Sequence, residues 1–307
     1  MNKITKYLTL TFLFPLVFAC TDLEIEGTDS VIAPVGEGFT GVEDVKGEVD
    51  NLASVIAGGN LQQVGGLYGL NEVSSDEYVV ATRGTDWGDN GRWLAMHQHT
   101  WNADLSDVVG TWRDLNSITL STTRIIHPSS VTTSSGDVDE LKAAAHFYRA
   151  WGMTWILDMF RQVPYRDVDL PNSAIPETLL GQDEIDFLVS DLTIAIDGLP
   201  EVGVGSSIDL KSIPSKATAR HLLAQLHLNK HVYLGETASN EDMQTVIDAV
   251  DAITASGYSL ASSGNFFDIF RPSNDTETIW WTASDAGQRI WYTLHYNLNS
   301  PENTGGG

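Results

Sequence analysis

The chain has 307 residues, 42% of them hydrophobic, and its 41 acidic against 17 basic side chains give a formal net charge of −24. A surface this acidic repels nucleic acid and anionic lipid headgroups, so both are excluded as partners of the folded part. The apolar content and the nine tryptophans exclude a disordered protein and indicate one large domain or two.

The N-terminus has the pattern of a secretory signal that ends at the only cysteine. Its first residues include two lysines, and a short apolar run then leads to Val17-Phe18-Ala19 and Cys20. The run is too short to span a bilayer as a helix, which predicts a cleaved signal peptide over residues 1–19. The aliphatic residue, alanine and cysteine resemble the lipobox of bacterial lipoproteins, in which Cys20 is acylated and anchors the protein durably. Ordinary secretion, with Cys20 as a chance residue, is the alternative.

The next segment, residues 20–42, is acidic, contains glycine and shows no periodicity, which predicts a flexible tether. A folded domain is expected over residues 43–307. Apolar residues at spacings of three and four predict that this domain is mainly α-helical. The expected helices cover residues 45–56, 105–126, 138–160, 183–197, 216–234 and 240–256.

Helix-end signals support these boundaries. Asp137 and Ser215 are typical N-caps, and Gly235 is a typical C-terminal stop. The helix that follows Asp137 is apolar on nearly all sides, so it is expected to lie between neighbours. Short turns and inward aromatic or alanine residues resemble tetratricopeptide-type helix pairs, with long irregular loops and few short strands. Only residues 278–282 look like a strand.

Residues 73–101 interrupt the helical pattern with glycines, the turn-forming run Asp89-Asn90-Gly91 and three tryptophans. A loop of this length is usually functional or disordered, and the tryptophans argue against disorder. Aromatic rings among Asp, Asn and Arg suit a sugar, whose C–H face stacks on an indole while its hydroxyls bond the polar groups. Trp87 and Trp93 are either such platforms or packing anchors of the loop, and Trp101 is expected to pack beside the next helix.

Motifs for catalysis or metal binding are weak. Asp76-Glu77, with Asp86 and Asp89, could supply the two carboxylates of a glycosidase, but proximity in so acidic a chain shows little. The pair His97-x-His99 lacks an evident third metal ligand, which favours a structural role. There is no Gly-x-Ser-x-Gly motif and no phosphate-binding glycine loop. These motifs therefore single out no catalytic residue, no cofactor site and no metal ligand.

Several segments, taken in this order, resemble the SusD/RagB family of outer-membrane nutrient-binding lipoproteins of Bacteroidetes. The likeness covers essentially all of residues 20–307. Its marks are Thr21–Glu24, Glu72–Glu77, Trp112, Ala144–Trp151 running to Phe160–Pro164, Ser215–Ala219 leading to Leu226–Asn229, and Phe266–Phe270 before Glu277–Trp280. The turn at Arg161-Gln162 departs from the Gly-Asp that is usual in the family. Family members also continue well beyond residue 306, so the chain is expected to be truncated and to lack part of the ligand surface.

The resemblance implies a lipoprotein at the outer membrane, facing the outside. It would capture oligosaccharides and pass them, without catalysis, to a SusC-like TonB-dependent transporter. It places the ligand site in the loop over residues 83–93, and a second aromatic residue further along the chain is a less strongly supported member of the site. The implied residues are Trp87 and Trp93 as stacking platforms, Arg83, Asp86, Asp89 and Asn90 as hydroxyl partners, and Trp291. A secreted glycoside hydrolase and a structural helical scaffold for protein partners remain as alternatives.

Overall fold

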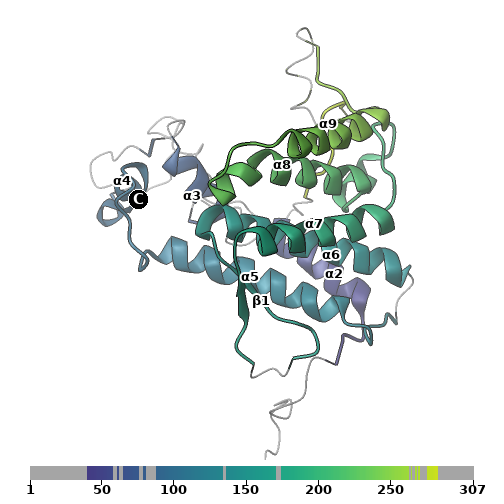
Figure 1. Cartoon of the computed structure of the whole chain (residues 1–307), viewed down its shortest axis with the longest axis horizontal. Helices are drawn as coiled ribbons and strands as arrows, with labels where there is room; N and C mark the ends of the chain where they lie inside the picture. Colours follow the sequence, from purple (N-terminus) through teal and green to yellow (C-terminus); the bar gives the residue numbers. More distant parts are fainter. Residues whose placement is uncertain are drawn as a thin grey trace, which may run out of the picture.

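Most helices of the chain lie in a stack in which each packs against the next one along the sequence (Figure 1). The structure is a computed structural model. It describes residues 40–57, 61, 65–75, 79–80, 88–133, 136–170, 174–262, 264, 267, 269 and 275–282. The stack consists of α5 (Ser106–Ile126), α6 (Val138–Phe160), α7 (Gln182–Gly198), α8 (Lys216–Leu234) and α9 (Asn240–Ala255), with α2 (Val45–Ala57) against α5 and α6. The prediction of a mainly α fold built from paired helices is confirmed.

The predicted helix ends agree with the observed ones to about one residue. The side chain of Asp137 accepts hydrogen bonds from the backbone N–H groups of Asp139, at 3.0 Å, and Glu140, at 3.4 Å. Ser215 and Thr218 form a reciprocal capping box at the start of α8. The same helix stops at Gly235, whose φ of 68° lies in the left-handed region that glycine adopts without strain.

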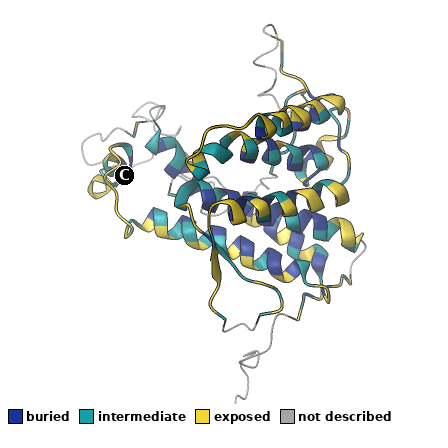
Figure 2. Cartoon of the chain, in the orientation of Figure 1, coloured by how far each residue is buried: buried dark blue, intermediate teal, exposed yellow. Residues whose placement is uncertain are grey.

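The main core surrounds α6, as its all-round apolar sequence predicts. Ala145, Ala150 and Ile156 on this helix are fully buried, and the helix contacts α2, α5, α7 and α8. Figure 2 shows buried residues along the facing sides of the stacked helices. Burying a large aliphatic or aromatic side chain stabilises a fold by about 1.5–3 kcal/mol, so this layer dominates the stability.

Some segments differ from the predictions. The helices α3 (Leu67–Ser74) and α4 (Arg92–His97) were not predicted, and α4 lies within residues 73–101, which were expected to form a loop. Residues 278–282 form no strand, because they lie against the 3-10 turn η3 (Ile208–Ser212) rather than beside another strand. The backbone N–H of Trp281 donates to the carbonyl of Lys211 at 3.1 Å, and its indole donates to the carbonyl of Ile208 at 2.8 Å. A short antiparallel hairpin forms elsewhere, from β1 (Val163–Tyr165) and β2 (Glu177–Leu179).

The folded part also includes the last residue of the predicted tether. Val42 is 9% exposed and belongs to the main core. Its backbone N–H donates to the hydroxyl of Ser130 at 2.9 Å, and its carbonyl accepts from Val131 at 2.9 Å. The predicted signal peptide, Cys20 and residues 20–39 lie outside the described residues.

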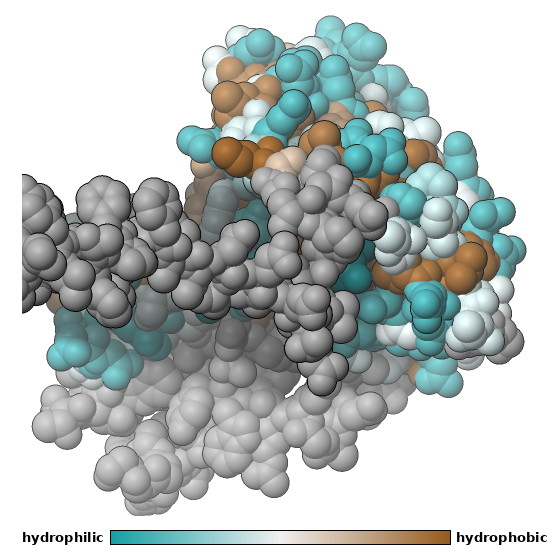
Figure 3. Space-filling view, turned by 90° about the horizontal axis from the view of Figure 1, so that it is seen from below, coloured by the Kyte–Doolittle hydropathy of each residue, from teal (hydrophilic) through white to brown (hydrophobic). Residues whose placement is uncertain are grey.

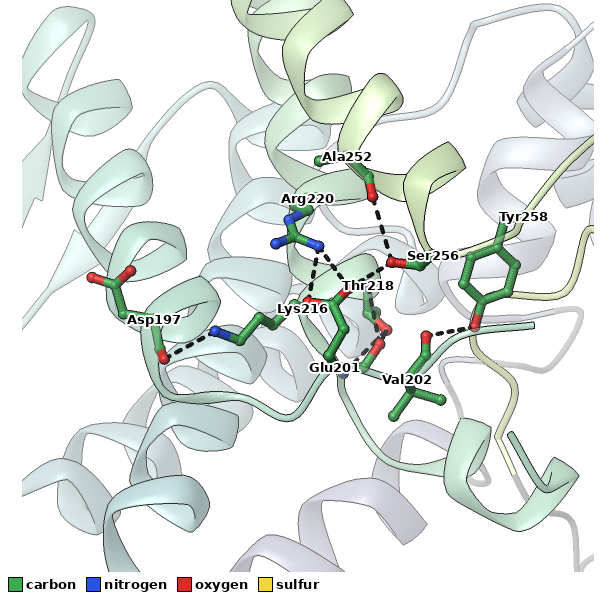
Figure 4. A network of polar contacts seen from close by, with 10 residues as sticks. Asp197, Glu201, Val202, Lys216, Thr218, Arg220, Ala252, Ser256 and Tyr258 are labelled. Atoms are coloured by element: carbon green, nitrogen blue, oxygen red, sulfur yellow. Dashed lines mark hydrogen bonds and ion pairs between the residues drawn. The ribbon is translucent and has the colours of Figure 1, made fainter. Parts of the chain in front are cut away.

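A polar network lies at the end of the stack where the α7–α8 connection meets the end of α9 (Figure 4). The carboxylate of Glu201 accepts from Arg220 on α8, at 2.9 Å, and from the hydroxyl of Ser256 just after α9, at 2.5 Å. The hydroxyl of Tyr258 donates to the carbonyl of Val202 at 3.0 Å. These bonds fix the connection between α7 and α8 against the end of α9.

Exposed apolar side chains occur in separate patches among polar ones on the face seen in Figure 3. Among the described residues, no helix is both long and apolar enough to cross a membrane. The long helices α5, α6 and α8 all carry charged residues along their length.

Asp242, in the first turn of α9, should make the α8–α9 pair sensitive to acid. Burial alone would raise the pKa of this carboxyl, but bonds from Ser239, His227 and Lys230 outweigh it and lower the pKa to about 2. A carboxyl group whose pKa is lower in the folded than in the unfolded protein stabilises the fold at pH values above its unfolded pKa. That stabilisation is lost as the pH falls toward the folded pKa. We expect Asp242→Asn to lower the free energy of unfolding by about 1 kcal/mol near neutral pH and by much less near about pH 2.

Urea titrations across this pH range measure the effect. The exposed Asp251→Asn on the same helix is the matched control and should change little at either pH. An Asp242→Asn penalty that does not depend on pH would contradict the linkage.

Candidate ligand-binding site

The sequence-predicted site residues are only partly covered by the structure. Arg83, Asp86, Trp87 and Trp291 lie outside the described residues. The described members are Asp89, Asn90 and Trp93, which lie in or beside η2 (Asp89–Gly91) and at the start of α4 (Arg92–His97). Together with α3 (Leu67–Ser74), α4 lies at one end of the helix stack (Figure 1).

The run Asp89-Asn90-Gly91 forms the tight turn that its sequence predicts. Its three φ angles are 37°, 55° and 82°, and the N–H of Gly91 donates to the carbonyl of Gly88 at 2.6 Å. Asp, Asn and Gly are the residue types that tolerate the left-handed region best. The turn leaves Asp89 and Asn90 exposed. Both can therefore offer polar groups to a ligand.

Trp93 is buried, with 2% of its surface exposed, in a small cluster with Leu70, Val73 and Met96. Its indole N–H donates to the Oδ2 of Asp89 at 2.6 Å, and the guanidinium of Arg92 lies 4.1 Å from its ring centroid. An indole enclosed in this way has no open face for a sugar. This contradicts the stacking role inferred for Trp93, which acts as the packing anchor of the turn.

A second interaction ties this turn to the start of α5. The guanidinium of Arg92 lies 3.6 Å from the Oδ1 of Asp107, which is 6% exposed. Burial raises the pKa of Asp107, and the positive charge of Arg92 opposes part of that rise. A Cβ atom at residue 65 would come within 2.6 Å of the same oxygen, so any residue larger than Gly65 would have to displace the Asp107 carboxylate. Sequence reasoning missed this pair because its members belong to different elements.

An open cavity of about 460 Å³ lies between this end of the stack and α3 and α4. Its lining residues are Leu70, Asn71, Ser74, Met96, Trp101, Asn102, Ala103, Val108, Asp158, Met159 and Phe160. Trp101, which was expected to pack beside the next helix, is 43% exposed and contributes to the lining of this cavity. The volume falls within the range of small-molecule sites.

Metal binding finds no support in the described part of the chain, where no group of three or more His, Cys, Asp or Glu residues could hold an ion. His99 is used structurally, since its Nε2 bonds the carbonyl of Ser74 at 2.7 Å. Of the four acids considered for a glycosidase, only Asp89 is described, and its Oδ2 accepts the indole N–H of Trp93.

Comparison with known proteins gives neither a matching family model nor a matching curated protein. Solved structures do match. A SusD-like protein from Bacteroides fragilis has a TM-score of 0.60 at 20% identity, over 80% of this chain and 46% of its own. The chain has a SusD-like fold. A structure with a xylogluco-oligosaccharide has a TM-score of 0.59 at 18% identity, and the match covers 76% of this chain and 46% of the other.

Surface glycan-binding protein A from Bacteroides thetaiotaomicron, in complex with laminarihexaose, gives a TM-score of 0.54 at 15% identity, over 76% of this chain and 47% of its own. The chain thus spans about half the length of the SusD-like structures it matches. The fold implied by the resemblance to the SusD/RagB family is confirmed. At these identities the match concerns the fold alone.

Proposed function

We propose that this chain is a cell-surface glycan-binding lipoprotein that captures oligosaccharides and passes them to a SusC-like TonB-dependent transporter. The observation that supports this most is the fold, because proteins with the same helix stack are described as glycan-binding or hold xyloglucan or laminarin oligosaccharides. The tryptophan-containing segment between α3 and α4 adds support, since its described end is a fixed turn with exposed polar residues.

In this proposal Trp87 provides the stacking face, with Trp291 as a second aromatic. Arg83, Asp86 and Asn90 bond sugar hydroxyls, and Asp89 contributes the oxygen that the indole of Trp93 does not use. Covering about 50 Å² of a sugar face stabilises binding by about 1.3 kcal/mol. A few such contacts, after ordering costs, give dissociation constants of millimolar to tens of micromolar. Such a site captures and releases its ligand.

Acylated Cys20 anchors the protein to the outer membrane, facing the extracellular side. Contact with the membrane is limited to the lipid, because the acidic body repels anionic headgroups. The transporter is the protein partner in this proposal. Catalysis and a cofactor are not required, since the polar groups and indoles only bind and release the sugar.

Replacing Trp87 with alanine should weaken oligosaccharide binding nearly tenfold, because one stacked face is worth about 1.3 kcal/mol. Calorimetric titration of the full-length protein with laminarihexaose and a xyloglucan oligosaccharide measures this. Ile175→Ala, a change at an 89%-exposed residue before β2, is the control and should bind as the parent does.

Three results would contradict the proposal. Binding that is unchanged by Trp87→Ala would remove the stacking site. Reducing ends that accumulate with time and disappear in Asp86→Asn would establish a glycoside hydrolase instead. Co-purification with a β-barrel transporter, with no affinity for any neutral glycan, would identify a structural scaffold.

A further inference from the structure

The indole of Trp101 is held in place although nearly half of it is exposed. Its ring meets the ring of His99 edge to face, with centroids 5.4 Å apart and planes at 73°. His99 is itself fixed, since it bonds the carbonyl of Ser74 at 2.7 Å and has a φ of 55°, which is uncommon for a residue other than glycine. Backbone strain of this kind is often found at binding sites. Trp101 is therefore a fixed aromatic platform at the cavity defined above.

Three polar side chains around this cavity each make one bond to the protein. The amide N–H of Asn71 donates to the carbonyl four residues earlier at 2.8 Å, and the amide oxygen of Asn102 accepts from the N–H two residues later at 3.0 Å. The Oδ1 of Asp158 accepts from the hydroxyl of Tyr233 at 3.1 Å. Among the described residues, the amide oxygen of Asn71, the amide nitrogen of Asn102 and the Oδ2 of Asp158 have no further bond.

Apart from Ser74, whose hydroxyl donates to the carbonyl of Asn71 at 3.3 Å, and the indole N–H of Trp101, the rest of the lining is apolar. Leu70, Met96, Met159 and Phe160 contribute hydrocarbon, sulfur and ring surface. A ligand that fits must therefore combine an apolar face with several hydroxyl-type groups at its edge. A pyranose ring has this character, because its C–H face stacks on an aromatic ring while its hydroxyls can both donate and accept.

We propose that this cavity is a saccharide subsite in which a sugar ring stacks on Trp101 and its hydroxyls bond Asn71, Asn102 and Asp158. The preferred sugar is uncharged. Asp158 is the ionisable residue among the described lining, and its carboxylate repels uronic or sulfated units. The inference deepens the proposed function, because it shares the ligand class, but it uses residues other than those of the Trp87 loop.

The cavity and the tryptophan-containing segment are neighbours along the chain. Ser74, the last residue of α3, lines the cavity, and the tryptophan-containing segment leaves α3 directly after it. A disaccharide is short enough to occupy the cavity alone, whereas a longer oligosaccharide extends beyond it. Ligand length therefore separates the two contributions.

The test uses the full-length protein labelled with 5-fluorotryptophan and observed by fluorine NMR. The Trp101 resonance is assigned by its loss in Trp101→Phe. We expect cellobiose or laminaribiose to shift this resonance in the parent protein and equally in Trp87→Ala, while a disaccharide that contains glucuronic acid shifts it much less. For laminarihexaose, Trp101→Ala should lose about tenfold in affinity, and Trp101→Phe and Asp158→Asn less.

The outcomes separate this inference from the proposed function. A Trp101 resonance that no neutral disaccharide moves, with full affinity for laminarihexaose in Trp101→Ala, overturns the subsite even where Trp87→Ala abolishes binding. The Trp101 resonance could still shift in Trp87→Ala while longer glycans bind equally well with and without Trp87. That outcome supports the subsite and contradicts the Trp87 site. An equal shift with the glucuronic acid disaccharide overturns the selection of neutral sugars. Since Trp101 is 43% exposed, its variants should fold, and thermal unfolding verifies this.

Discussion

Replacing Asp191 with alanine is expected to lower the free energy of unfolding by about 3–5 kcal/mol, because it leaves a buried arginine without its counter-charge. The carboxylate of Asp191, on α7, accepts two bonds from Arg149 on α6, both at 2.7 Å, and a third from His146 at 2.7 Å. The side chains of Asp191 and Arg149 are 3% and 8% exposed. Burial would raise the pKa of Asp191, but these partners outweigh it and keep the pKa low.

Urea unfolding followed by circular dichroism measures the change. Two controls separate burial from charge. Glu201→Gln breaks the partly exposed pair with Arg220 and should cost at most about 1 kcal/mol. The double replacement Arg149→Met with Asp191→Leu removes both charges and should cost clearly less than Asp191→Ala alone. A loss of less than about 1 kcal/mol in Asp191→Ala would show that the ion pair is not essential to the α6–α7 contact.

This ion pair illustrates which parts of the fold can be predicted from the sequence. The periodicity of α6 and its cap at Asp137 depend on neighbouring residues, and both were predictable. The partner of Arg149 was not, because Asp191 belongs to another helix and looks, in sequence, like one more acid on an acidic chain. Pairings between elements depend on how helices cross, which local patterns do not contain.

The strand predictions failed for the same reason. The alternating, β-branched and aromatic run at residues 278–282 fits a half-buried strand, but what it packs against is η3. The hairpin of β1 and β2 has only three residues in each strand and a proline in the first, so it carries almost no periodic signal. In the candidate site, the turn at Asp89-Asn90-Gly91 was predictable from residue type, whereas the cavity at Trp101 joins three separate segments of the chain.

Replacing Trp93 with alanine should destabilise the α3–α4 end of the molecule by about 3–5 kcal/mol, as is typical of a large buried aromatic residue. The cluster around Trp93 is separate from the main core, so the loss should appear as local opening. Hydrogen exchange of the amides in α3 and α4 measures it, and the amides of α7 and α8 should keep their protection. Trp93→Phe keeps most of the packing and loses the bond to Asp89, which costs about 1 kcal/mol.

The two Trp93 variants also decide what this residue does for a ligand. If Trp93 anchors the turn, Trp93→Phe should keep most of the affinity for laminarihexaose, because Asp89 and Asn90 stay exposed on the same backbone. Trp93→Ala should lose affinity together with protection of α4, since the turn then loses its support. A platform that touched the sugar would behave differently: affinity would fall in Trp93→Ala while exchange in α4 stayed unchanged. That result would return Trp93 to the role that its 2% exposure argues against.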